Sequence, residues 1–282
     1  MLIMFIGTAD LQEKLHEWGV TKMVVERGIA QPDSGQQASG GAQDAVIFIH
    51  GFLDSHATWG PLIQSLSASA SLLIALDLRG AGALRAHVGP YTLQQSVADI
   101  MEMIELRGIN RFPLVGHSMG AQIAELIAWQ VPEQVTSLTL ITPTPLAGNT
   151  LPDDVRTFLR ESGGDPVAQR EIRRLFSKNL NDDQLDLLVA RDRLMGVEAV
   201  RGYYDAFSVG DSKGLGPCPY EGPTLILGAM DDLVIPLQQV EEIRRTRLPN
   251  AAFQLIEDSG HWPQLEQPAK TAAVLAEHLG LN

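Results

Sequence analysis

The sequence predicts an α/β fold in which a mostly parallel sheet is covered by helices on both faces. Six short apolar runs are continuous rather than alternating, which is typical of strands that are buried on both faces. Segments with helical periodicity separate these runs, and this alternation indicates a doubly wound sheet. The chain has 282 residues, of which 45% are hydrophobic, so it is long enough to bury a sizeable core.

The expected elements follow in chain order. A first strand region at Met23–Glu26 leads into a Gly-, Ser- and Gln-rich loop at Pro32–Gln43. The buried strands are expected at Val46–Ile49, Leu72–Leu76, Leu114–Val115, Leu138–Ile141, Leu225–Leu227 and Phe253–Ile256. The helices that flank them are expected at Gln94–Leu106, Ala121–Gln130, Val240–Arg247 and Ala269–Leu279.

Residues 143–222 interrupt this alternation. They contain no good strand but four helical stretches, at Asp153–Glu161, Ala168–Leu180, Asp183–Leu194 and Val197–Phe207. A helical insertion between two strands is expected to cover the carboxyl edge of the sheet, where the sites of α/β proteins form. We therefore predict a core domain of residues 1–142 and 223–282, with a helical cap of residues 143–222.

Composition excludes several classes of function. The formal net charge of −13 argues against binding to nucleic acids or anionic membranes. The single cysteine, Cys218, excludes an internal disulfide, and no apolar run approaches the ~18 residues of a membrane-spanning helix. The first ten residues lack the basic region of a signal peptide. We expect a cytoplasmic monomer or homodimer, and the sequence shows no metal-ligand spacing or need for a cofactor.

A candidate nucleophile lies in the stretch LVGHSMGA, at residues 114–121. Gly116 to Gly120 match the pattern G-x-S-x-G between an apolar strand and a helix. In that setting the serine occupies a sharp turn, and the flanking glycines avoid the clashes that side chains would cause. The turn lifts the Ser118 hydroxyl above the sheet and directs the positive end of the next helix toward it. Ser118 is therefore the expected nucleophile.

A nucleophilic serine needs a base and an orienting carboxylate. His261 follows the last predicted strand by a short loop, which brings it to the same sheet edge as Ser118. Asp231 and Asp232 follow the strand before it, whereas the loop after Leu138–Ile141 offers no carboxylate. The residues alone leave the choice between Asp231 and Asp232 open.

Two backbone N–H groups should bind the developing oxyanion. We expect them from Met119, which follows the nucleophile, and from Phe52 in the turn after the strand Val46–Ile49. His50, His117 and Trp262 lie beside these positions in the sequence. We expect all three to line the substrate pocket.

Together these motifs make the chain resemble the α/β-hydrolase superfamily, and in particular its serine esterases. The resemblance covers nearly the whole chain and includes FIHGFLDSHATW, LIALDLRGAG, LVGHSMGAQIA, LILGAMDDLVIP and SGHWPQLEQP in the family order. It implies Ser118 as nucleophile, His261 as base, and Phe52 and Met119 as oxyanion amides. The family pattern places the acid three residues after a glycine and four before a proline. The count from Gly228 leads to Asp231, whereas the count back from Pro236 leads to Asp232. We favour Asp231, on the expectation that Gly228 ends its strand.

The expected activity is hydrolysis of a small-molecule carboxylic ester through an acyl-enzyme. The alternative is cleavage of a C–C bond, or the reaction of a lyase like those of the menaquinone pathway, on the same triad. The segment GHWPQLE resembles that of C–C hydrolases, but the loop HGFLDSHATW lacks their glycine-rich pattern. For the alternative, cap arginines such as Arg191, Arg193 and Arg201 would bind a substrate carboxylate. A non-catalytic binding module is disfavoured because all three triad residues are present.

Overall fold

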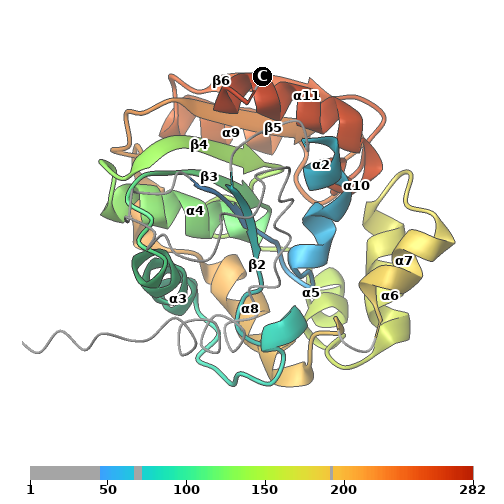
Figure 1. Ribbon diagram of the computed structural model, residues 1–282. Helices are drawn as coiled ribbons and strands as arrows, with labels where there is room; N and C mark the ends of the chain where they lie inside the picture. The colour runs from blue at the N-terminus through green and yellow to red at the C-terminus, as the bar shows by residue number, and fades with distance from the viewer. Residues whose placement is uncertain (1–44, 67–71, 191–192, 282) are drawn as a thin grey trace, which may run out of the picture.

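The computed structural model describes residues 45–66, 72–190 and 193–281, and within them six strands form one parallel sheet. The order across the sheet is β2-β1-β3-β4-β5-β6 (Figure 1). The strands are β1 (Ala45–Ile49), β2 (Leu72–Leu76), β3 (Phe112–His117), β4 (Val135–Ile141), β5 (Thr224–Ala229) and β6 (Ala252–Ile256). Each of the six buried strands expected from the sequence lies within one of these. The expected segments Met23–Glu26 and Pro32–Gln43 lie outside the described residues.

Helices cover both faces of the sheet, which confirms the doubly wound arrangement. On one face, α3 (Leu93–Leu106), α4 (Met119–Gln130) and α9 (Leu237–Arg247) contribute to a single apolar core with alternate strand residues. On the other face, α2 (Gly60–Ser65) and α11 (Pro268–Leu279) pack on the remaining strand residues. A short helix, α10 (Pro263–Glu266), and the 3₁₀ turns η1 (His56–Trp59), η2 (Gly82–Leu84) and η3 (Ser212–Leu215) complete the layers.

The connections between strands place a crevice at the ends of β1 and β3. From β1 the chain moves outward to the edge strand β2 and then crosses back to β3, so β1 and β3 are neighbours whose following segments diverge. In α/β sheets, ligands bind at such a switch point, beyond the carboxyl ends of the strands. The loops that follow β1 and β3 carry Phe52 and Ser118.

Four helices lie between β4 and β5, as the sequence predicts. They are α5 (Asp153–Arg160), α6 (Pro166–Phe176), α7 (Asp182–Leu188) and α8 (Val197–Val209), and they gather along one side of the sheet, coloured from yellow-green to light orange (Figure 1). The Asp165 side chain caps α6, and Asn181 forms a reciprocal capping box with Gln184 at the start of α7. The domain boundaries after residues 142 and 222 stay a prediction.

No helix of the described ranges combines the length and the apolar character that crossing a bilayer requires.

The turn between β3 and α4 is packed so closely that it accepts glycine alone at two positions. A Cβ on Gly116 would overlap the backbone of Gly120, and a Cβ on Gly120 would overlap the carbonyl oxygen of Ile49 at the end of β1. Both neighbours are backbone atoms, of α4 and of β1, which cannot move aside as a flexible side chain can. The spacing of the two glycines is therefore a packing requirement.

We expect Gly120→Ala to lower the melting temperature by about 2–12 °C, because overpacking costs about 1–3 kcal/mol and each kcal/mol shifts the melting temperature of a fold of this size by about 2–4 °C. Gly216→Ala is the matched control, since no atom lies within 4 Å of a Cβ at that position. Thermal denaturation followed by circular dichroism measures both. Equal melting temperatures for the two variants would contradict the packing requirement.

Candidate active site

Ser118 occupies a backbone conformation that serine rarely adopts. It connects β3 to α4 with φ 53° and ψ −118°. Left-handed residues other than glycine cost about 1–3 kcal/mol each and persist only where their surroundings hold them. Here the Ser118 N–H donates to the Ile141 carbonyl at 3.0 Å, and the Ser118 carbonyl accepts from the N–H groups of Ala121 and Thr144. The turn thus presents the hydroxyl above the sheet edge.

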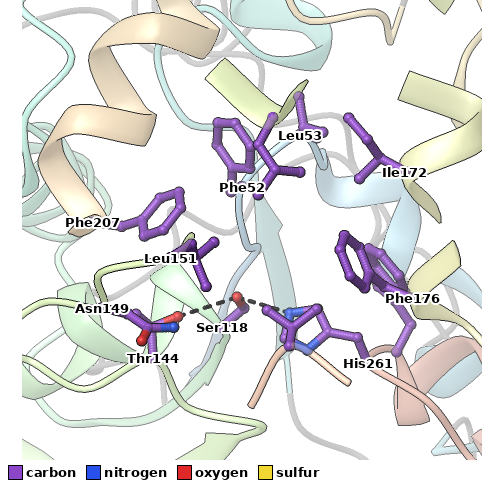
Figure 2. A pocket seen from close by; sticks show the side chains of 13 residues that line it. Phe52, Leu53, Ser118, Thr144, Asn149, Leu151, Ile172, Phe176, Phe207 and His261 are labelled. Atoms are coloured by element: carbon purple, nitrogen blue, oxygen red, sulfur yellow. Dashed lines mark hydrogen bonds between the residues drawn. The ribbon is translucent and has the colours of Figure 1, made fainter. Parts of the chain in front are cut away.

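A chain of hydrogen bonds joins three side chains that are far apart in the sequence. His261 Nε2 lies 3.0 Å from Ser118 Oγ (Figure 2), and His261 Nδ1 lies 2.8 Å from Asp232 Oδ2. The other oxygen of Asp232 accepts from the backbone N–H groups of Val234 and Ile235 at 2.7 and 3.0 Å. The carboxylate is therefore fixed on both sides and cannot turn away from the imidazole.

The prediction of Asp231 as the acid is wrong, and the alternative Asp232 contacts His261. The Asp231 carboxylate is 37% exposed and pairs with Lys178 Nζ at 2.7 Å. The reason is the length of β5, which continues through Ala229 instead of ending at Gly228. The extra strand residue moves the turn by one position, so the count back from Pro236 leads to the carboxylate that contacts His261.

The loop that carries His261 is held by its backbone. The Glu266 carboxylate accepts from the N–H groups of Gly260 and Trp262, and the His261 N–H donates to the Phe176 carbonyl at 2.9 Å. Glu266 also accepts from the N–H groups of residues 178 and 179, at the end of α6. Three consecutive amides are therefore fixed, and with them the direction of the imidazole.

The two expected oxyanion amides belong to the loops that meet at the switch point. Met119 is the first residue of α4, where helix N–H groups have no partner within the helix. Phe52 follows Gly51 in the turn after β1. Within the described ranges, neither N–H donates to another backbone group. Both remain free to bind an anion, and their role stays a prediction.

The Ser118 hydroxyl opens into an apolar pocket of about 480 Å³, part of it open to solvent. Figure 2 shows Ser118 and His261 on one side of the pocket and Phe52, Leu53 and Ile172 on the other. Helices α5, α6 and α8 of the segment between β4 and β5 supply part of the wall. Its apolar residues are Phe52, Leu53, Leu151, Leu159, Ile172, Phe176, Phe207, Val234 and Trp262, and its polar residues are Ser118, Thr144, Asn149 and His261.

Two of the three expected pocket residues do not line it. Trp262 does, but His50 and His117 are buried below the site. His50 Nε2 accepts the N–H of Leu78 at 3.0 Å, which joins the ends of β1 and β2. His117 Nε2 donates to the His261 carbonyl at 2.8 Å. Both imidazoles therefore brace loops instead of contacting a ligand.

The loop after β4, which offers no carboxylate, still contributes polar groups that the sequence reasoning missed. Thr144 Oγ1 lies 3.4 Å from Ser118 Oγ, and the Asn149 amide oxygen accepts from Gln239 at 3.1 Å. The cap arginines considered for a substrate carboxylate lie elsewhere. Arg201 pairs with Glu161, Arg193 donates to a carbonyl of α7, and Arg191 lies outside the described residues.

Electrostatics distinguish the two neighbouring histidines. Burial lowers the pKa of His261, but attraction to the Asp232 carboxylate and the hydrogen bond to it outweigh burial and raise the pKa above its usual value. Burial also lowers the pKa of His117, to about 4, and the nearby His261 charge acts in the same direction. A proton taken up at this site near neutral pH therefore resides on His261. Within the described ranges, no three His, Cys, Asp or Glu side chains form a cluster that could hold a metal ion.

The arrangement of fold and site agrees with a known family. The model of a family described as "alpha/beta hydrolase fold" matches residues 44–268. The chain belongs to the alpha/beta hydrolase fold family. This establishes the fold that the sequence predicts.

Individual known proteins are similar to most of this chain. The dihydrolipoyllysine-residue acetyltransferase component of an acetoin cleaving system from Cupriavidus necator is 28% identical over 86% of the chain, and the match spans 65% of that protein. A putative 2-succinyl-6-hydroxy-2,4-cyclohexadiene-1-carboxylate synthase from Bacillus subtilis is 25% identical over 93% of the chain and 98% of its own length. A thermophilic esterase structure from Thermogutta terrifontis superimposes with a TM-score of 0.71 at 23% identity, covering 85% of this chain and 90% of the esterase.

We expect the His261 imidazole to lose its proton above pH 6.5, the ordinary value for histidine, and His117 to stay neutral until the pH falls to about 4. Imidazole NMR signals followed against pH measure both. Asp232→Asn removes the negative charge that outweighs burial, so the pKa of His261 should fall. Asp231→Asn should leave this pKa unchanged. A drop in Asp231→Asn alone would contradict the geometry.

Proposed function

We propose that the protein is a serine hydrolase that cleaves a small, uncharged carboxylic ester through an acyl-enzyme. The observation that carries this proposal is the hydrogen-bonded series Ser118–His261–Asp232 facing an apolar pocket. Each distance falls in the range expected of a nucleophile, its base and an orienting carboxylate. The similarity to a solved esterase structure supports the fold on which this chemistry would operate.

Acylation would begin at Ser118 Oγ. As it attacks the ester carbonyl, its proton would pass to His261 Nε2, which lies 3.0 Å away. The resulting imidazolium is stabilised by the Asp232 carboxylate, consistent with the raised pKa of His261. When the tetrahedral intermediate collapses, His261 would return the proton to the departing alcohol oxygen.

The oxyanion of that intermediate would accept hydrogen bonds from the N–H groups of Phe52 and Met119. Each such donor contributes ~3–4 kcal/mol of transition-state stabilisation in comparable sites. Water would then attack the acyl-enzyme, with His261 as base, and release the acid. The neutral imidazole is the reactive form at both stages, so kcat/KM should rise as the pH passes upward through the raised pKa of His261.

The pocket wall indicates an uncharged acyl group. Among the residues that the structure describes, thirteen line the pocket, nine of them apolar and none of them Asp, Glu, Lys or Arg. A carboxylate transferred into such surroundings without a partner loses hydration that nothing replaces. An aliphatic or aromatic acyl chain instead gains about 25 cal/mol for each Å² of apolar surface removed from water.

The second candidate reaction is that of a lyase or C–C hydrolase on the same three side chains. The near full-length similarity to the putative synthase from Bacillus subtilis favours it. A substrate of that kind carries carboxylates, which need cationic partners in the pocket. The lining residues that the structure describes include no Lys or Arg to pair with them, and for this reason we rank ester hydrolysis first.

We expect Ser118→Ala to abolish turnover of p-nitrophenyl butyrate and Asp232→Asn to lower kcat by ~10³–10⁴-fold. Asp231→Asn is the matched control one residue away, and its kcat should stay within about 2-fold, because exposed ion pairs contribute little. Steady-state kinetics measure all three. Ester turnover that survives Ser118→Ala would refute the proposed function.

A pair of substrates of similar length tests the charge of the acyl group. We expect kcat/KM for p-nitrophenyl butyrate to exceed that for the mono-p-nitrophenyl ester of succinic acid by ~100-fold or more, since an unpaired buried carboxylate costs several kcal/mol. Both esters share one leaving group, so the ratio reports on the acyl pocket. Equal or reversed values would favour the second candidate reaction.

A further inference from the structure

A fully buried arginine connects helix α6 to the turn that carries the Phe52 amide. Arg173 is 0% exposed, and its Nη2 atom donates to the Leu53 carbonyl. The same nitrogen lies 3.5 Å from Asp54 Oδ1, and Nη1 donates to the Gln169 carbonyl of its own helix at 3.0 Å. Arg173 is not among the residues that line the pocket. Its guanidinium is therefore directed at the protein and away from any ligand.

The turn that Arg173 reaches is one that needs support. The Asp54 N–H donates to the Gly51 carbonyl at 3.3 Å, so Phe52 and Leu53 are the central residues of a four-residue turn. Leu53, the third residue, has a φ of 64°, in the left-handed region that favours glycine at this position. A leucine held there relies on its neighbours to keep the turn in shape. The conformation of this turn sets the direction of the Phe52 N–H.

Asp54 links the same turn to the histidine loop. Its Oδ2 atom accepts from Trp262 Nε1 at 2.9 Å and lies 3.7 Å from His117 Nδ1. His117 in turn donates to the backbone carbonyl of His261. The Asp54 carboxylate is fully buried, with Arg173 as its cationic neighbour. The turn Gly51–Asp54 and the loop that carries His261 are therefore joined through one buried carboxylate, by the bond from Trp262.

We propose that Arg173 is a positioning residue, which fixes the turn Gly51–Asp54 so that the Phe52 amide meets the oxyanion. The proposal rests on the proposed function, because it assigns Arg173 an effect on the tetrahedral intermediate. Arg173 acts through the Leu53 carbonyl and the Asp54 carboxylate and touches no substrate atom. Its loss should therefore lower kcat and leave KM nearly unchanged.

The test compares Arg173→Lys and Arg173→Met with Arg174→Met, a neighbour on α6 whose partners are exposed. With p-nitrophenyl butyrate, we expect kcat to fall ~10–100-fold in the Arg173 variants, the loss typical of a displaced catalytic group. KM should stay within about 2-fold, and Arg174→Met should behave as wild type. Arg173→Lys keeps the buried charge, so it provides a folded protein if Arg173→Met does not fold.

A second readout separates positioning from general stability. An aliphatic trifluoromethyl ketone forms a tetrahedral adduct that needs the oxyanion amides, whereas the matching methyl ketone does not. We expect Arg173→Lys to weaken binding of the first by about the factor lost in kcat and to leave binding of the second unchanged.

Two results would overturn the inference. One is a lower melting temperature with unchanged kcat and unchanged trifluoromethyl ketone affinity, which would make Arg173 a purely structural residue. The other is a higher KM confined to carboxylate-bearing esters, which would make it a substrate ligand. Failure of the proposed function is recognised separately, because Ser118→Ala would then keep its ester turnover.

Discussion

The site depends on one close backbone contact, between the first turn of α4 and the end of β1. Gly120 approaches the Ile49 carbonyl so nearly that no side chain fits between them, and Gly116 meets Gly120 across the turn. This contact brings the Ser118 turn beside the Phe52 turn at the switch point of the sheet. Once these two turns are adjacent, His261 and Asp232 can approach from the ends of strands on the far side.

The sequence predicts those elements whose formation depends on residues close together in the chain. Continuous apolar runs identify the six described strands, and the strand–turn–helix pattern predicts the position of Ser118 between β3 and α4. The predicted Asp231 lies one residue before the carboxylate that contacts His261, because the end of β5 is set by its neighbour: Ala229 pairs with Ile256, and Met230 donates to the Ile256 carbonyl. Strand length of this kind is decided by pairing across the sheet, which the sequence of one strand does not contain.

Side-chain direction was the second limit of sequence reasoning. His50 follows β1 and His117 ends β3, both at the expected sheet edge, but Leu78 and His261 supply partners that turn both rings away from the pocket. The same holds for the helices between β4 and β5. Phe176 and Phe207 line the pocket whereas Phe158 is exposed, although all three lie in helices with similar patterns. The packing of these helices on the sheet edge decides which side chains line the pocket and which face solvent.

The Glu266 carboxylate has a consequence for the movement of α6. Its four backbone donors come in equal numbers from the histidine loop and from residues 178 and 179, just past α6. A hinged swing of α6 away from the sheet would break two of these bonds together with the Arg173 contacts, leaving buried charges without partners. Access by rotation of pocket side chains, on the scale of nanoseconds, breaks none of them. These contacts therefore oppose a swing of α6 and tie the helix to the histidine loop.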